Sequence, residues 1–190
     1  MEEIDPRHLL VDIANILDRL NIPYMITGGM AVFVWGRPRF TADIDIVVEL
    51  KSEDVNNLEK ALMALSEVGY VDKNSIERAL MRYGEFNFID GKTGVKVDFW
   101  VLSRNSFDSG RLKRRINRKI LNKNVYFISP EDLILSKLRW YKQAESSRHL
   151  EDIESILKIQ KKLDLRYIRK WAKEQSTIKI FERLLKKIKN

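Results

Sequence analysis

The stretch Met25–Leu50, MITGGMAVFVWGRPRFTADIDIVVEL, limits the fold and chemistry of this chain more than any other. It predicts a short apolar strand, a Gly-Gly turn, a short buried helix, a basic loop and a strand that opens with Asp43 and Asp45. Side chains alternate between the two faces of a strand, so the two carboxylates share one face, and Ile44 and Ile46 share the other. Adjacent carboxylates repel each other unless a cation lies between them, and oxygen ligands suit Mg²⁺. The stretch therefore predicts a divalent-metal site.

The rest of the chain alternates between helical and extended patterns up to residue 128. Asp5-Pro6 is a helix start, because an N-cap residue is followed by proline in the first turn. Residues 24–27 and 125–128 predict short strands, and residues 85–89 and 95–102 predict a hairpin around Asp90-Gly91. These patterns predict an α+β fold, with a mixed sheet of four or five strands flanked by helices.

The composition changes near Ser129, where Ser-Pro-Glu-Asp forms a strong helix start and only helical patterns follow. We therefore divide the chain into a core, residues 1–128, and a C-terminal helical bundle, residues 129–190, packed on that core. Residues 103–124 are polar and basic, and their pattern assigns no element.

Composition excludes several classes of protein. There is no cysteine, which excludes disulfides and thiolate metal sites and favours a reducing, cytoplasmic setting. No stretch approaches the roughly 18 uninterrupted apolar residues of a membrane span, and the N-terminus does not resemble a signal peptide. We therefore expect no membrane partner.

The net charge of +8 is concentrated in the sequence. Residues 161–190 contain eleven Lys or Arg against three acids, which accounts for the whole excess, and a second basic tract spans residues 111–123. Basic tracts suit a polyanionic partner, so these two are candidate surfaces for RNA, including a tRNA end. Solvated helix faces are the alternative explanation.

A third strand aspartate, Asp98, interrupts the apolar alternation of Val97, Phe99 and Val101. A carboxylate in such a strand is costly unless it is paired or ligates a metal. Pairing with Lys96 or an arginine is the structural alternative.

Together, the glycine pair, the Asp-Ile-Asp pair thirteen residues later and Asp98 resemble the nucleotidyltransferase superfamily of DNA polymerase beta. The resemblance covers residues 24–102. Thr27, before the glycines, departs from the apolar residue that is usual in the superfamily. The helical part is similar to AbiEii-type stand-alone nucleotidyltransferases, in the segment from Ser129 to Lys137 and in Arg148 with Glu151-Asp152-Ile153.

The resemblance implies a cofactor, a co-substrate and a set of site residues. It implies Mg²⁺ or Mn²⁺ as the cofactor and an NTP as the co-substrate. Asp43, Asp45 and Asp98 are expected to hold the metal and to be catalytic, with Asp98 also able to take a proton from the acceptor. Expected nucleotide-binding residues are a glycine turn at a helix N-terminus and nearby donors: Gly28, Gly29, Arg39, Thr41 and Lys137.

The predicted function is transfer of NMP from NTP to a hydroxyl of RNA, a protein or a small molecule, with release of pyrophosphate. A toxin role with a cognate antitoxin is part of this prediction. The alternative is a non-catalytic nucleotide-, RNA- or partner-binding module on the same fold. Two local alternatives stay open: Lys137 as a surface lysine with its amine in solvent, and Asp152 paired with Arg148 one helical turn away.

Overall fold

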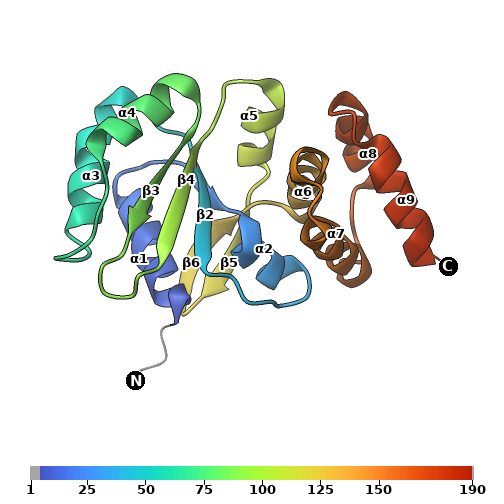
Figure 1. Ribbon diagram of the computed structural model, residues 1–190, viewed down its shortest axis with the longest axis horizontal. Helices are drawn as coiled ribbons and strands as arrows, with labels where there is room; N and C mark the ends of the chain where they lie inside the picture. Colours follow the sequence, from blue (N-terminus) through green and yellow to red (C-terminus); the bar gives the residue numbers. More distant parts are fainter. Residues whose placement is uncertain (1–4, 190) are drawn as a thin grey trace.

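The structure is a computed structural model that describes residues 5–189, with side chains to residue 188 (Figure 1). Residues 1–4 of the predicted core and Asn190 of the second basic tract lie outside the described residues. The first half of the described chain contains α1 (Pro6–Arg19), β1 (Tyr24–Ile26), α2 (Gly28–Trp35), β2 (Asp43–Val48), the 3-10 turn η1 (Ser52–Asp54), α3 (Val55–Met63), α4 (Lys73–Arg82), β3 (Glu85–Ile89) and β4 (Lys96–Val101). The second half contains α5 (Ser106–Lys113), β5 (Ile116–Ile120), β6 (Lys123–Phe127), α6 (Pro130–Ala144), α7 (Ser147–Ile159), α8 (Leu165–Glu174) and α9 (Ile178–Lys189).

The strands form one mixed sheet in the order β3-β4-β2-β1-β6-β5. Strands β3–β4 and β5–β6 are antiparallel hairpins, β1 is antiparallel to β2, and the pairs β2–β4 and β1–β6 are parallel. The α+β fold with helical flanks and C-terminal helices is confirmed. The described chain has six strands in this sheet, however, and not the predicted four or five.

The additional strand comes from residues 103–124, which contain α5 and β5. β5 is an edge strand in which Ile116 and Ile120 are half-buried and the three residues between them are exposed, so it lacks an apolar alternation. α5 buries only Phe107 and Leu112 among its apolar side chains. Neither element carries a hydrophobic pattern long enough to be recognised from sequence.

The helices cover both faces of the sheet (Figure 1). Helices α1, α3 and α4 lie on one side, α2, α5 and α6 lie on the other, and α8 and α9 are outermost. Buried apolar side chains from Leu10 of α1 to Phe181 of α9 belong to one hydrophobic cluster. None of the helices in the described range combines the length and the apolar character needed to cross a membrane.

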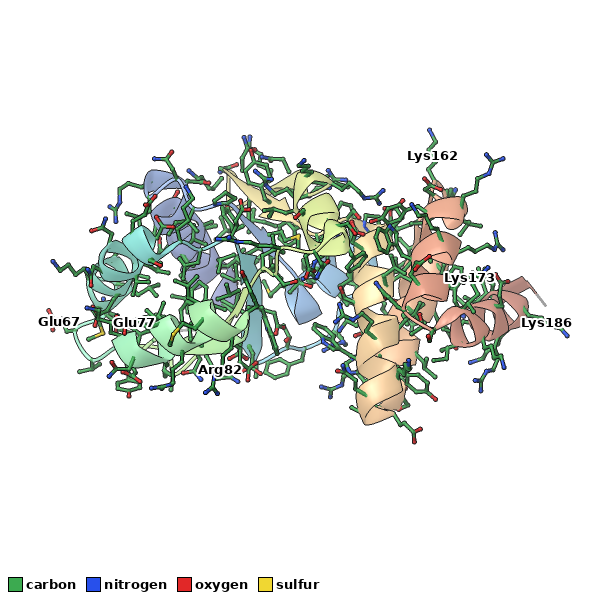
Figure 2. All side chains as sticks on the ribbon, turned by 90° about the horizontal axis from the view of Figure 1, so that it is seen from above. Glu67, Glu77, Arg82, Lys162, Lys173 and Lys186 are labelled. Carbon is green, nitrogen blue, oxygen red and sulfur yellow. The ribbon has the colours of Figure 1, made fainter. Side chains whose placement is uncertain are left out.

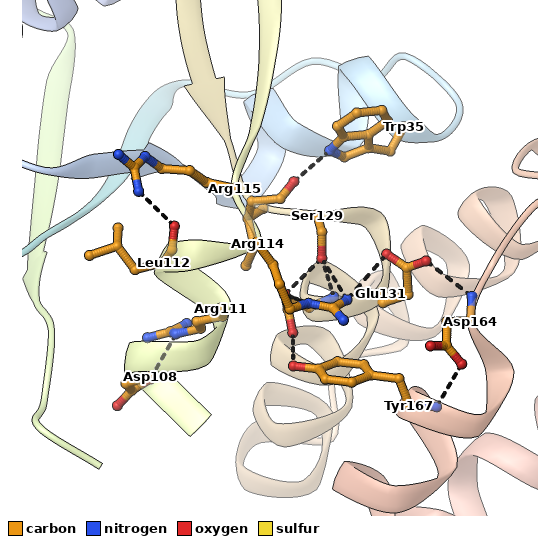
Figure 3. Close-up of polar contacts among 12 residues, drawn as sticks. Trp35, Asp108, Arg111, Leu112, Arg114, Arg115, Ser129, Glu131, Asp164 and Tyr167 are labelled. Atoms are coloured by element: carbon orange, nitrogen blue, oxygen red, sulfur yellow. Dashed lines mark hydrogen bonds and ion pairs between the residues drawn. The ribbon is translucent and has the colours of Figure 1, made fainter. Parts of the chain in front are cut away.

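A buried carboxylate joins α5, α6 and α8. Asp132, which is fully buried, accepts hydrogen bonds from Ser129 Oγ at 2.7 Å, Tyr167 OH at 2.7 Å and Arg114 Nε at 3.1 Å. The Arg114 guanidinium also lies 3.5 Å from the centre of the Tyr167 ring. Figure 3 shows the Arg114 side chain, which follows α5, next to the ring of Tyr167 on α8. The contact fixes α8 against the start of α6.

Arg114 is typical of the first basic tract, whose cations mostly contact this chain itself. Arg111 Nε lies 2.7 Å from Asp108 Oδ1, and Arg115 donates to Leu112 O and lies over the Tyr126 ring. Three members of the tract have exposed side chains: Lys113, Arg118 and Lys119. The prediction that residues 111–123 bind RNA is therefore weakened, because few of these charges are free.

The Asp132 contact predicts the effect of a minimal substitution. Tyr167→Phe removes the only hydroxyl that α8 offers to this buried carboxylate, and hydrogen bonds to charged groups contribute about 1.5–3 kcal/mol. We expect the free energy of unfolding, measured by urea titration, to fall by about that amount. Tyr141→Phe on α6 is the matched control and is expected to change it by less than about 0.5 kcal/mol. Equal effects of the two variants would contradict the assignment.

Candidate active site

The three predicted aspartates share one face of the sheet. Asp43 and Asp45 lie on β2 with their side chains on the same face, and Asp98 lies on β4. The parallel register of β2 and β4 places Asp45 directly beside Asp98. The sheet therefore brings together carboxylates that are more than fifty residues apart in the sequence.

The glycine pair makes room for the side chains of this site. Gly28 begins α2 with a φ of +59°, a left-handed conformation that side chains rarely adopt. A Cβ on Gly28 would overlap with Asp45 Oδ2, and one on Gly29 would overlap with Thr41 Oγ1. Thr41 Oγ1 also donates to Asp43 O at 3.2 Å. The two glycines thus allow α2 to begin directly against the carboxylate strand and the loop before it.

The charges on this face are not balanced. Burial, and next the charge of Asp98, raise the pKa of Asp45, while Lys137 opposes the shift. Asp98 is partly compensated, because Lys96 Nζ lies 2.8 Å from Asp98 Oδ2. The pairing with Lys96 that the sequence left open is therefore present. Asp43 makes no ion pair within residues 5–188.

The donor set suits a divalent cation, although it does not form a closed metal cage. No three His, Cys, Asp or Glu side chains of the described residues already converge as a metal-binding group. A divalent cation between Asp45 and its neighbours would relieve the repulsion that raises the pKa of Asp45. The Lys96 side chain that pairs with Asp98 is 42% exposed, so it has room to move away when a metal binds. The residues therefore fit the predicted metal, whose binding stays a prediction.

Two predicted nucleotide-binding cations meet on one carboxylate of α7. Arg39 donates to both oxygens of Asp152, from Nε at 2.8 Å and from its terminal nitrogen at 2.9 Å. Lys137 Nζ lies 2.8 Å from Asp152 Oδ2, and both of these side chains are buried. Burial alone would raise the pKa of Asp152, but the hydrogen bond from Arg39 and the charge of Lys137 outweigh it and hold that pKa below its usual range.

This arrangement corrects two sequence-based alternatives. Asp152 pairs with Arg39 and Lys137 and not with Arg148, because tertiary contacts from α6 and the loop before β2 reach the buried face of α7. The Lys137 amine is inside the protein and not in solvent. Sequence reasoning missed Asp152 as a site residue. The available signal was the position of Asp152 one helical turn before Ile156, on the apolar face of α7. Its partner Arg39, however, lies 113 residues away in the sequence.

A cavity of about 320 Å³ adjoins the carboxylate face. Two hydroxyls in its wall are buried without a hydrogen-bond partner in the described part of the chain: Thr27 Oγ1 and Ser136 Oγ. Leaving one such group unsatisfied costs about 1–3 kcal/mol, so polar ligand atoms or water are expected here. Trp100 also lines this cavity, next to Asp45, and opposes the rise in the pKa of that carboxyl, whereas Trp35 is a core residue whose Nε1 donates to Ile128 O.

The contact between Gly28 and Asp45 predicts that a methyl group at residue 28 disturbs the site. Gly28→Ala introduces left-handed strain of about 1–2 kcal/mol and pushes the Asp45 carboxylate out of its position. We expect a lower melting temperature. Gly110→Ala in α5 is the control, because nothing lies within 4 Å of its added Cβ. That variant is expected to be neutral or stabilised by roughly 0.5–1 kcal/mol, and a neutral Gly28→Ala would contradict the close contact.

The pairing of Asp152 predicts an acid-sensitive contribution to stability. Its pKa is lower in the folded chain than the ordinary value of about 3.9, so the contribution is present above that pH and is lost as the pH falls toward the folded pKa. Asp152→Ala should cost about 3–5 kcal/mol at neutral pH, since it leaves the buried Lys137 and the partly buried Arg39 unpaired.

Urea unfolding at a series of pH values measures both effects. Asp152→Asn should lose less stability than the wild type between about pH 5 and pH 3. Asp12→Asn, at an exposed position on α1, should keep the wild-type pH dependence. An Asp152→Asn variant with the wild-type slope would show that the pair does not hold the carboxylate ionised.

Several solved structures share this fold. The antibiotic-resistance factor ANT(2″)-Ia is 18% identical with a TM-score of 0.63, covering 93% of this chain and 95% of that chain. An antigenic nucleotidyltransferase-like protein from Paracoccidioides brasiliensis is 20% identical with a TM-score of 0.57, covering 96% and 93%. The lincosamide antibiotic adenylyltransferase LnuA, in a lincomycin-bound structure, is 13% identical with a TM-score of 0.55, covering 83% and 98%. At these identities the likeness shows the fold.

Family membership comes from the sequence. No curated protein matches the chain in a sequence comparison. The profile of the family described as "Nucleotidyl transferase AbiEii toxin, Type IV TA system" matches residues 9–183, nearly the whole of the described range. The match includes the carboxylate strands, the glycine turn and the helices that carry Lys137 and Asp152. The chain therefore belongs to the AbiEii nucleotidyltransferase family.

Proposed function

We propose that this protein transfers a nucleoside monophosphate from an NTP to an acceptor hydroxyl and releases pyrophosphate, with Mg²⁺ or Mn²⁺ held by Asp43, Asp45 and Asp98. The observation that carries the proposal is the position of these carboxylates on adjacent parallel strands, directly against the glycine turn of α2. Family membership supports the same reaction class. When bound, the metal would supply charge neutralisation at the phosphates and at the attacking and leaving oxygens.

The cations of the site suit the triphosphate. Arg39 precedes the carboxylate strand and Lys137 is on α6, and Asp152 holds both of them on one side of the site. A triphosphate is a stronger polyanion than one carboxylate, so its oxygens compete for the same donors. Asp152 then keeps Arg39 and Lys137 in position without neutralising them fully. The N–H groups at the start of α2 add further donors for phosphate oxygens.

The acceptor reacts on the exposed side of the carboxylates. Its hydroxyl oxygen forms a bond to the α-phosphorus, the bond from that phosphorus to the bridging oxygen breaks, and pyrophosphate leaves with the electron pair. The hydroxyl proton passes to the Asp98 carboxylate, whose Oδ2 lies 2.8 Å from Lys96 Nζ. These steps give each of the three aspartates a role consistent with its place in the sheet.

RNA is the acceptor class that the charge distribution favours, and a toxin role beside a cognate antitoxin follows from the family description. The cations of α8 and α9 are mostly exposed, in contrast to those of residues 111–123. A small-molecule acceptor is the alternative, since a structure of the similar ANT(2″)-Ia contains adenylyl-2″-tobramycin.

Incubation with each labelled NTP, Mg²⁺ and total cellular RNA, a protein extract or a set of aminoglycosides tests the proposal. We expect label transfer by the wild type, its abolition by EDTA, and its loss by at least about 100-fold in Asp43→Asn and Asp98→Asn.

Asp12→Asn on α1 is the matched control, because it makes the same change at an exposed site and should transfer normally. NTP binding without transfer to any acceptor class would overturn the proposal and favour a non-catalytic nucleotide-binding module. Transfer that persists in both aspartate variants would remove these carboxylates from the mechanism.

A further inference from the structure

Two cavities form one groove that leads away from the carboxylate face. The inner cavity, about 320 Å³, reaches Thr27 and Trp100 on that face. The outer cavity, about 480 Å³, lies between α5, α6 and α8 and reaches Trp171. The two cavities adjoin each other, because they share three lining residues: Asn105, Arg139 and Gln143. The groove therefore connects the candidate active site with the C-terminal helices.

The inner end of the groove is built to receive polar atoms. Thr27 is 2% exposed and Ser136 is 5% exposed, and the hydroxyl of each has no hydrogen-bond partner in the part of the chain that the structure describes. Both residues line the inner cavity. Buried polar groups are almost always satisfied, so these hydroxyls point to a ligand or to ordered water.

The free charges along the groove are mainly positive. Asp108 in the wall is already paired with Arg111 at 2.7 Å. Arg139 and Lys142 line the outer cavity, are exposed and make no ion pair within residues 5–188, while Glu174 is the one acid of that cavity. A polycationic acceptor would meet repulsion along this path, whereas a polyanion would be attracted.

The positive character continues beyond the groove onto α8 and α9. Lys170 and Lys173 on α8 are exposed, and Lys170 Nζ lies 5.4 Å from the centre of the Trp171 ring. In Figure 2, Lys162, Lys173 and Lys186 lie at the end of the molecule formed by these two helices, and Glu67 and Glu77 lie at the opposite end. An approaching polyanion is therefore directed to the outer mouth of the groove.

Aromatic rings accompany these cations. Trp140 lines the inner cavity and Trp171 the outer one, and both are only partly buried. Cations beside partly exposed aromatic rings are the pattern of single-strand binding, in which the bases stack on the rings and the cations hold the backbone.

We propose that this groove is the track along which the single-stranded 3′ end of an RNA acceptor reaches Asp45 and Asp98, with Arg139 and Lys142 holding its phosphates. The inference rests on the proposed function and names the substrate class and its path. Each cavity, at about 320 and 480 Å³, has the size of a site for one small ligand or one nucleotide, which favours a single strand over a base-paired end.

Fluorescence anisotropy tests the track with a labelled single-stranded RNA of about ten nucleotides, titrated at several salt concentrations in the absence of NTP. The double variant Arg139→Ala/Lys142→Ala should bind at least about tenfold more weakly than the wild type. The slope of log K against log salt should become shallower by about 1.4, the value for two lost phosphate contacts. A blunt duplex of equal length should bind the wild type more weakly than the single strand.

The matched control is Lys60→Ala/Lys92→Ala, which removes the same charge from α3 and from the turn between β3 and β4, both distant from the groove. This control should keep nearly the wild-type slope and affinity. The proposal is overturned if the control and the groove variant weaken binding equally, if the duplex binds as tightly as the single strand, or if the wild type binds no RNA.

NMP transfer separates this inference from the proposed function. Transfer to a small molecule and to no RNA, at equal rates in the wild type and in Arg139→Ala/Lys142→Ala, would overturn the track and leave the proposed function standing. Groove-dependent binding of the single strand without NMP transfer to any acceptor would overturn the proposed function and leave the track standing. Transfer to RNA that falls with binding in the groove variant supports both.

Discussion

The buried contact of Asp152 with Arg39 and Lys137 connects the two parts of the candidate site. Arg39 belongs to the loop before the carboxylate strand, and the other two residues belong to the C-terminal helices. Without this carboxylate, Lys137 would be buried and uncompensated, which is strongly unfavourable, and Arg39 would lose its ion pair. Arg39 can reach Asp152 only when the helices pack on the core, so the same packing places both cations on the α6–α7 side of the candidate site. Stability and the proposed phosphate binding depend on one interaction.

The opposite charges of the site lie in separate places. Asp45 and Asp98 are adjacent on the sheet, where burial and the charge of Asp98 raise the pKa of Asp45, and Lys96 pairs directly with Asp98. Arg39 and Lys137 are held by Asp152, on the α6–α7 side. Such a separation keeps an excess of negative charge where a metal is expected and positive charge where phosphates are expected. A nucleotide bound with its metal would bring matching charges to both places.

Much of the fold was predictable because its elements carry strong local signals. Asp5-Pro6 and Ser129-Pro130 begin α1 and α6 as predicted, and the 85–89 and 95–102 segments form the hairpin β3–β4. The aspartates were identifiable because carboxylates in apolar strands are costly. The β5 edge strand and the pairing of Arg39 with Asp152 were not, since an exposed edge needs no apolar alternation and an ion pair over 113 residues leaves no local pattern. The roles of the site residues remain predictions that await the transfer assay.

The parallel pairing of β1 and β6 has a consequence for how this architecture can diversify. Ile26 and Phe127 are neighbours in that ladder. The helices that follow these strands, α2 and α6, therefore start beside each other at the carboxyl ends of β1 and β6. The separation between the glycine turn and the start of α6 is therefore set largely by the main-chain hydrogen bonds of this ladder. The span between these two helix starts depends little on the side chains of other elements. Changes in α5 and α8, which lie outside this ladder, can reshape the far end of the groove and leave that span intact.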